Sequence, residues 1–546
     1  MSADWASIFL PVGLVMLVRL LPAWFWPTFT SDAGYHLLMR REIRNNGFRI
    51  PRKLTPCVFD EQVTYPWLYH QWIAFLPETW LRRVPALPSA VIDGCHAALA
   101  YLGGAWLATS LGHPGAAPQA GFWSAILFGI NPALLAHGLG PRAYEMTPRP
   151  LGELFFSMLM LAAIWAAQGG GVAGWVVSAL AGGALLLSSK FAAQVLAFFV
   201  PLLALVPGFH AVAWMLPASF VTAMLLSRGR YFHVLRGQIV HLRWYRRKQQ
   251  YATEMISGRN RWREIQQIGS AICEHGLFSR EVVRSLGRAY TTNTYLLALS
   301  RGGLFLVLLF ICTWTDPRCT GMDLGAFPSL CLLAWAFIWV FPFVLTSMRH
   351  YRFLGEAERY AEYGILPAAI LVGVGLAIAP PSAARAVVLL LYALSAVGVV
   401  GHAWAINARA SRTETRDRDE LVDALRKLPA GSTLLGIPAM HVLAPVAFRL
   451  PHRYADITTD GVQLIGLIEN RFQDYPWPKP DWEMWRSLGV DYVVTFSPEF
   501  LRATRPSLPY DRIPLELAYA NPSYRVYAYS GDAGLGEKMI DAATGL

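Results

Sequence analysis

Eleven apolar stretches, each about long enough to cross a bilayer, constrain this 546-residue chain more than any other feature. A transmembrane helix needs about 20 consecutive, mostly apolar residues. The stretches are 7–26, 89–110, 119–137, 150–167, 173–188, 191–207, 209–226, 293–313, 325–347, 365–380 and 383–407. Glycine and proline groups at 169–171 and 380–381 mark turns between them. The sequence therefore predicts a polytopic α-helical membrane protein with about eleven transmembrane helices.

The amino-acid composition supports this fold class and limits the classes of molecule that the chain is expected to bind. Only 15% of the residues are charged and 54% are hydrophobic, which is too little charge for a soluble protein. The net charge of +11 points to anionic membrane lipids or phosphate. We expect no nucleic-acid partner, because no basic patch accompanies a nucleic-acid-binding motif. The six cysteines show neither CxxC nor zinc-ligand spacing, so neither a disulfide framework nor a metal site can be read from them.

Three stretches do not belong to the membrane, namely 27–88, 227–292 and 408–546. Each follows an odd-numbered apolar stretch, so all three are expected on one side. Charged residues near the ends of apolar stretches are costly and frequently functional. Those of this chain fall on the same side, at Arg19, Asp93, Glu153, Lys190 and Arg301. We predict a transmembrane catalytic domain at 1–407, with loops 27–88 and 227–292 on its active-site side, and a soluble domain at 408–546.

The orientation of that side is set by two conflicting considerations. Basic residues usually mark the cytoplasmic side, and the segment 227–292 alone carries thirteen basic residues against four acidic ones. A site that handles a lipid phosphate needs cations for its own chemistry, however, so we expect the loop-bearing side to be extracytoplasmic. Aromatic and basic residues alternate in this segment, which is typical of a helix in the headgroup layer, acting either as an anchor or as a substrate gate.

The segment 408–546 has the pattern of a small α/β domain. A charged linker is expected at 411–420, followed by helix, turn and strand at 421–436. A helix and a buried strand are expected at 485–496, and Val526 and Tyr527 fit a final strand. The segment contains no glycine-rich phosphate loop and no nucleophile elbow, so we expect it to be structural or to position an acceptor.

The candidate catalytic residues follow the first apolar stretch directly. Asp32 and His36, in the sequence TSDAGYH, stand four positions apart on an expected short helix, so both can face one way. Asp32 is either a group that performs chemistry or a residue that caps the helix.

Candidate substrate-binding residues occur in three further clusters. Asp60, Glu61, Tyr65 and His70 combine carboxylates with an aromatic platform, which suits a sugar ring or an interfacial belt. Arg142, Tyr144 and Arg149 form a polar cluster that enters an apolar stretch. Arg352, Glu356 and Tyr360 share a helical face, and Arg359 can pair with Glu356. Arginines at a membrane surface suit a phosphate leaving group, and a salt-bridged amphipathic helix is the alternative.

These features together resemble the GT-C superfamily of membrane glycosyltransferases. The resemblance rests on Asp32 in TSDAGYH, on the YPWLYHQW segment from Tyr65, on the arginine-rich GEAERY stretch, and on the order of spans and loops. It implies transfer of a sugar from a polyprenyl-phosphate donor to a glycan, lipid or protein acceptor. The location implied is a bacterial inner or cell membrane, with the active site on the extracytoplasmic side.

The resemblance also implies roles for residues. Asp32 would be the general base that deprotonates an acceptor hydroxyl, with inversion at the sugar, and His36 would orient it or share the proton. Arg149, Lys190, Arg352 and Arg359 would stabilise the departing phosphate. SDAGYH stands where paired acidic residues are common in the superfamily, so a divalent metal is left open as a cofactor. A flippase or transporter for an anionic or lipid-linked substrate, and a lipid-linked glycan polymerase or ligase, are the alternatives.

Overall fold

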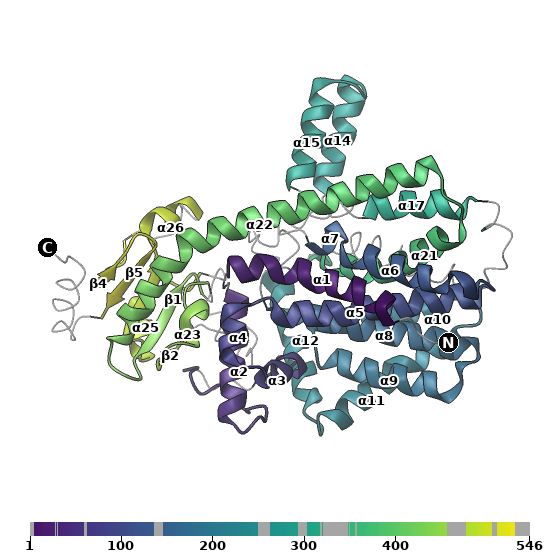
Figure 1. Cartoon of the computed structure of the whole chain (residues 1–546). Coiled ribbons are helices and arrows are strands. Elements are labelled where there is room, and N and C mark those ends of the chain that lie inside the picture. Colours follow the sequence, from purple (N-terminus) through teal and green to yellow (C-terminus); the bar gives the residue numbers. More distant parts are fainter. Residues whose placement is uncertain are drawn as a thin grey trace.

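A computed structural model describes most of the chain. The described residues are 5–27, 29, 31–58, 63–135, 146–248, 262–292, 303–316, 319, 348, 350–354, 358–439, 441–455, 477–504, 510 and 512–529. Figure 1 shows a long bundle of helices with a small mixed domain at one end.

Apolar helices form the bundle, and they follow the expected apolar stretches. They are α1 (Trp5–Phe25), α5 (Leu87–Ser110), α6 (Ala117–Gly129), α7 (Pro132–Leu135), α8 (Arg149–Trp165), α9 (Gly171–Leu186), α10 (Lys190–Ala204), α11 (Met215–Leu226), α17 (Leu304–Trp314), α21 (Glu358–Ile378) and α22 (Ala383–Arg426). The core of the bundle forms where α5, α6 and α21 pack together. A Cβ added to Gly104 or to Gly373 would lie 2.3 Å from Ser124 Oγ, so only glycine permits this approach.

Four described segments are long and apolar enough to cross a membrane: Ser7–Phe25, Arg149–Leu186, Arg359–Ile378 and Ala383–Arg409. A fifth arises if His210–Leu226 and Tyr231–Arg243, which meet at a bend of 120°, are one broken span. Lys190–Ala204 and Leu304–Trp314 are shorter apolar helices. The count of about eleven spans therefore stays a prediction, and the expected span 325–347 lies outside the described residues.

The helical segment Arg149–Leu186 is interrupted where the sequence predicts a turn. The turn Ala166–Gly170 separates α8 from α9. Gly169 has a φ of 97° and Gly171 a φ of 69°, a region that disfavours residues with a Cβ. The glycine triplet therefore ends one helix and begins the next.

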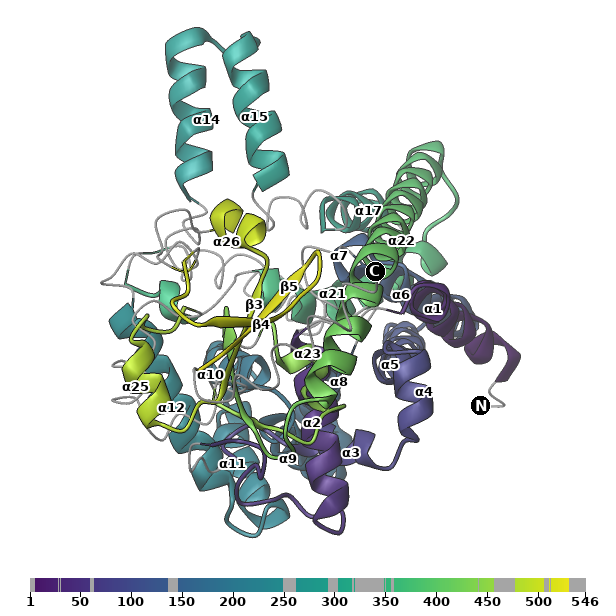
Figure 2. The same ribbon diagram turned by 90° about the vertical axis from the view of Figure 1, so that its left-hand side faces the viewer.

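The remaining helices and turns lie mostly in the three predicted non-membrane segments. The first carries α2 (Ser31–Asn45), α3 (Leu68–Ala74) and α4 (Glu78–Arg83), and the second carries α12 (Tyr231–Lys248), α14 (Trp262–His275) and α15 (Arg280–Thr292). The third carries α23 (Ala444–Ala447), α25 (Trp482–Ser487) and α26 (Pro498–Thr504). Short 3₁₀ turns lie at η1 (Pro114–Ala116), η5 (His210–Trp214) and η8 (Arg352–Leu354). In Figures 1 and 2 the α14–α15 hairpin projects away from the bundle, crosswise to α22.

The three non-membrane segments contact one another. The Arg230 guanidinium donates to the Ile50 carbonyl oxygen at 2.8 Å, which joins the second segment to the first. A Cβ on Gly34 would lie 2.0 Å from the Ala444 carbonyl oxygen, so α2 rests directly on α23 of the third segment. The first segment therefore contacts both of the others, and their placement on one side of a membrane stays a prediction.

A five-stranded sheet lies near the C-terminus. Its strands are β1 (Thr433–Ile437), β2 (Arg453–Tyr454), β3 (Tyr492–Phe496), β4 (Glu516–Ala520) and β5 (Tyr524–Ala528), in the order β2-β1-β3-β5-β4. β1 pairs in parallel with β2 and β3, whereas β5 pairs antiparallel with β3 and β4. The helix and strand expected at 421–436, the strand expected near 492, and the strand at Val526 and Tyr527 are confirmed.

Helix α22 joins the bundle to this sheet without a break. It runs for 44 residues, so the expected domain boundary between 407 and 408 falls inside one helix. The charged linker expected at 411–420 is wrong, because that stretch is helical. It contains neither glycine nor proline, and Arg416 pairs with Glu420 one turn further along at 3.0 Å.

Candidate functional site

Helix α2 carries the predicted catalytic pair at the meeting point of the three segments. Asp32 lies in the first turn of α2 with its side chain exposed, and His36 lies one turn later with 3% of its surface exposed. An acidic residue in the first turn also suits the helix dipole. The close approach of Gly34 to Ala444 fixes α2 against the C-terminal sheet domain.

His36 forms a buried hydrogen bond with a second predicted residue. Its Nδ1 lies 2.8 Å from Nε2 of His70, which is completely buried on α3. One of the two nitrogens must donate and the other must accept, so the two rings share one proton across this contact. Tyr35 and Tyr65 pack edge-on against His70, with ring centroids 6.1 and 5.4 Å away. The pair is therefore held in a rigid aromatic enclosure.

Lys190 extends this cluster into the helix bundle. It is the first residue of α10, and its Nζ lies 5.0 Å from the Tyr65 ring centroid, a cation–π contact. The next residue, Phe191, lies under the Arg359 guanidinium at 4.9 Å and against the Tyr360 ring at 5.8 Å. Helix α10 therefore bridges the first segment and the start of α21, and it brings three predicted residues, Lys190, Arg359 and Tyr360, together.

Arg149 has a carboxylate partner that the sequence did not suggest. Its guanidinium lies 3.2 Å from Glu362 on α21, and both side chains are buried. Tyr360, two residues before Glu362, donates to the Leu354 carbonyl oxygen at 2.8 Å and also bonds Gln194. These contacts fix α8 and α10 to the start of α21.

Asp32 lies near a residue of the C-terminal sheet domain. His441 has an exposed side chain, and the Asp32 carboxylate is close enough to interact electrostatically with its imidazole. His441 stands three residues before Ala444, which contacts Gly34. The chain beyond α22 therefore contributes to the immediate electrostatic surroundings of Asp32.

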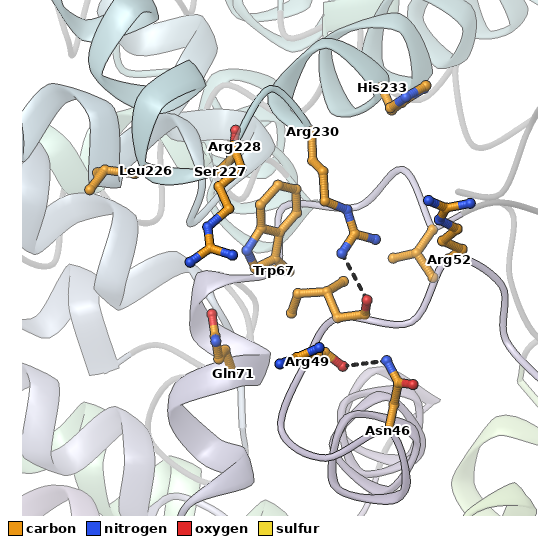
Figure 3. A pocket seen from close by; sticks show the side chains of 12 residues that line it. Asn46, Arg49, Arg52, Trp67, Gln71, Leu226, Ser227, Arg228, Arg230 and His233 are labelled. Carbon is orange, nitrogen blue, oxygen red and sulfur yellow. Dashed lines mark hydrogen bonds between the residues drawn. The ribbon is translucent and has the colours of Figure 1, made fainter.

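A second polar feature is an open cleft of about 1300 Å³ beside the end of α2. Figure 3 shows its labelled polar lining, which comes from the chain after α2, from α3 and from the turn between α11 and α12. The lining residues are Asn46, Arg49, Ile50, Arg52, Val63, Trp67, Gln71, Leu226, Ser227, Arg228, Arg230 and His233. The cleft is thus lined by four arginines and by none of the predicted site residues.

Solved structures share the fold of this chain, although comparison of its sequence with known families and curated proteins finds no match. The crystal structure of ArnT from Cupriavidus metallidurans bound to undecaprenyl phosphate matches 97% of this chain and 99% of its own, with a TM-score of 0.54 and 16% identity. Its apo state gives a TM-score of 0.54 at 15% identity, with 96% and 98% covered. The apo oligosaccharyltransferase of Archaeoglobus fulgidus gives 0.51 at 14% identity, with 91% and 70% covered.

The chain shares the fold of these structures over nearly its whole length. The resemblance inferred from the TSDAGYH and YPWLYHQW segments is confirmed at the level of the fold, and four described segments are long and apolar enough to cross a membrane. The structure brings together His36, His70, Tyr65 and Lys190, with Arg359 and Tyr360 alongside, while Asp32 lies one helical turn from His36.

Several predicted residues lie outside the described part of the structure. They are Asp60, Glu61, Arg142, Tyr144 and Glu356. Arg352 is described only in its backbone, in the turn η8. Among the residues that the structure describes, no three His, Cys, Asp or Glu side chains gather in a way that could hold a metal ion.

Sequence reasoning missed the arginines of the cleft. The basic excess of 227–292 is visible in the sequence, but nothing there shows that Arg228 and Arg230 meet Arg49 and Arg52. The signal that could have suggested it is the clustering of arginines in two non-membrane segments that are expected on one side.

Proposed function

We propose that this chain is a membrane glycosyltransferase that moves a sugar from a polyprenyl-phosphate carrier to an acceptor hydroxyl. The observation that carries the proposal is the likeness over nearly the whole length to an ArnT structure bound to undecaprenyl phosphate. The clustering of His36, His70 and Lys190 beside Asp32 supports it, because it supplies proton-transfer groups and a cation within one polar region.

Asp32 is proposed as the general base. Its carboxylate takes the proton of the acceptor hydroxyl while that oxygen forms a bond to the anomeric carbon of the sugar. The bond from the anomeric carbon to the phosphate oxygen breaks at the same time, and its electron pair leaves with the phosphate. Attack opposite the leaving group inverts the configuration. His36, held by His70, is proposed to orient Asp32 or to share the proton.

Cations are proposed to stabilise the departing phosphate. Lys190 and Arg359 are the best supported, because Lys190 contacts the Tyr65 ring that packs on His70, and Arg359 contacts Phe191, the residue after Lys190. Arg352 is proposed on sequence spacing alone. Arg149 would act mainly by positioning, because Glu362 already balances its charge.

The sugar and acceptor subsites are proposed from the remaining predicted residues. Tyr65 and His70 offer an aromatic and polar wall to a sugar ring, and Tyr360 adjoins Lys190 through Phe191. Asp60, Glu61, Arg142, Tyr144 and Glu356 complete the proposed substrate contacts. The acceptor is a glycan, a lipid or a protein, and the domain 408–546 is proposed to position it through the contact between α2 and α23.

The proposed location is a bacterial inner or cell membrane, with Asp32 on the extracytoplasmic side. Loop-side arginines such as Arg230 and Arg359 contact aromatic rings or backbone carbonyls at this end of the bundle, which supports a functional reason for the basic excess there. A divalent metal remains open as a cofactor on sequence grounds.

The decisive experiment compares Asp32→Asn with wild type in lipid nanodiscs. A panel of polyprenyl-phosphate sugars serves as donor, and release of polyprenyl phosphate is measured. Loss of a general base lowers turnover by about 10²- to 10⁴-fold. Asp423→Asn is the matched control, because that carboxylate is exposed and pairs with Arg426 on the same helix.

Two results would contradict the proposal. Turnover by Asp32→Asn close to that of wild type removes Asp32 as the base. Movement of the intact lipid-linked sugar across the bilayer, without release of polyprenyl phosphate by any variant, identifies a flippase instead.

A further inference from the structure

The arginine cleft is separated from the histidine pair by one short segment. Residues 63–71 present Tyr65 and His70 to the Asp32 helix, and they present Trp67 and Gln71 to the cleft. Figure 3 shows Trp67 and Gln71 beside Arg49 and Arg228. The cleft is therefore a different compartment from the proposed catalytic centre, and its use needs a separate explanation.

The charge of the cleft is one-sided. Among the described residues that line it are four arginines and His233, and none of those described lining residues is an aspartate or a glutamate. Within the described part of the chain, no carboxylate forms an ion pair with Arg49, Arg52 or Arg228. Clustered guanidinium groups without a balancing acid attract an anion, and guanidinium matches phosphate oxygens in pairs.

Arg230 anchors the back of the cleft. Its guanidinium donates to the carbonyl oxygens of Ile50 at 2.8 Å and Pro51 at 3.1 Å, and it lies 5.7 Å from the Trp67 ring centroid. Burial lowers the pKa of Arg230, and the positive charge of Arg52 lowers it further. The like charges thus oppose one another here, and a bound anion would relieve that repulsion.

The backbone conformation of Arg228 is a second, independent observation that points to a role for its side chain. Arg228 has a φ of 50°, a left-handed conformation that costs a residue with a Cβ about 1–2 kcal/mol. It follows the end of α11, where glycine is the usual residue in that conformation, and Gly229 comes next. A strained arginine where glycine would serve indicates that its side chain is needed in the cleft.

From these observations we infer that the cleft is a second anion site, which binds a phosphate-bearing group through Arg49, Arg52 and Arg228. Arg230 holds the wall in place and Trp67 closes one side. The phosphate belongs either to a lipid headgroup at the membrane surface or to a soluble phosphate compound. Binding requires no chemistry at Asp32, so the site does not depend on the proposed transferase activity.

The test is protection of individual arginines against phenylglyoxal, which modifies guanidinium groups, in the full-length protein. Modification is mapped by mass spectrometry with and without pyrophosphate, and in nanodiscs with and without phosphatidic acid. We expect Arg49, Arg52 and Arg228 to react several-fold more slowly when phosphate groups are present. Arg236 and Arg243, exposed on α12 and outside the cleft, are the internal controls.

The outcomes separate the sources of phosphate. Protection by phosphatidic acid alone supports a lipid headgroup, protection by pyrophosphate alone supports a soluble ligand, and protection by both supports shared recognition of phosphate. No protection, or equal protection of Arg236 and Arg243, overturns the inference. Asp32→Asn should retain the protection, so failure of the proposed transferase and failure of this site are distinguishable.

Variants give a second, independent measurement. Arg228→Gly removes the guanidinium while suiting the left-handed backbone, so the fold is preserved or stabilised. Pyrophosphate affinity should fall at least tenfold in Arg228→Gly and in the double variant Arg49→Ala/Arg52→Ala, whereas Arg243→Ala should match wild type. Unchanged affinity in both cleft variants also overturns the inference.

Discussion

The two faces of the segment 63–71 recognise charge in different ways. On one face, His36 and His70 are buried, hydrogen-bonded to each other and enclosed by tyrosine rings. On the other, Arg49, Arg52 and Arg228 are exposed around an open cleft. A buried hydrogen-bonded pair fixes positions and tolerates little change, whereas exposed cations around an open cleft act by charge and are screened by salt.

The largest effect on stability is expected at the buried Arg149–Glu362 pair inside the helix bundle. Glu362→Ala leaves the buried Arg149 without its carboxylate, and removing one partner of such a pair costs about 3–5 kcal/mol. The melting temperature in detergent should therefore fall by several degrees. Asp423→Ala, in the exposed pair with Arg426, should change it little. An equal change in melting temperature in the two variants would mean that the buried Arg149–Glu362 pair contributes no more to stability than the exposed Asp423–Arg426 pair.

A smaller effect is expected from breaking the histidine pair. His70→Phe keeps an aromatic ring in the enclosure but removes the partner of His36 Nδ1, at a cost of about 1–3 kcal/mol for an unsatisfied buried group. Turnover should fall by roughly 10- to 100-fold, with protection of Arg49 by pyrophosphate unchanged. A matching loss of that protection would show that the two faces are one coupled site.

The smallest effect should come from salt. Raising the ionic strength from about 0.05 to 0.5 M shortens the screening length and weakens contacts between exposed charges. Pyrophosphate binding should weaken several-fold in wild type and far less in Arg49→Ala/Arg52→Ala. The ratio of turnover by wild type to that by His70→Phe should stay constant over the same range. A salt-independent pyrophosphate affinity would mean that the cleft binds its ligand without exposed charges.

Local sequence patterns predicted features that are set by residues close together in the sequence, such as helices. The apolar stretches anticipated the described bundle helices, and the spacing of Asp32 and His36 placed both near the start of one helix. Contacts between distant segments could not be anticipated in the same way. Tyr65 meets Lys190, and Arg149 meets Glu362, only because helices packed in the bundle bring them together.

The stretch 411–420, which was expected to be a linker, shows that composition alone does not predict where a helix ends. A run of charged residues was taken as a flexible connection, although the absence of glycine and proline allows the helix to continue. The cleft could not be predicted from composition either. Its arginines form one site only because the end of α2 lies beside the turn after α11.

The unbroken α22 has a mechanical consequence. A helix of 44 residues is about 66 Å long at 1.5 Å per residue. Its first part, Ala383–Arg409, is apolar enough to cross a membrane, and its last turns lead into the five-stranded sheet. Tilting the helix by about 5° about its first residue would move its last residue by roughly 6 Å, so a small change in tilt would shift the sheet domain on which α2 rests.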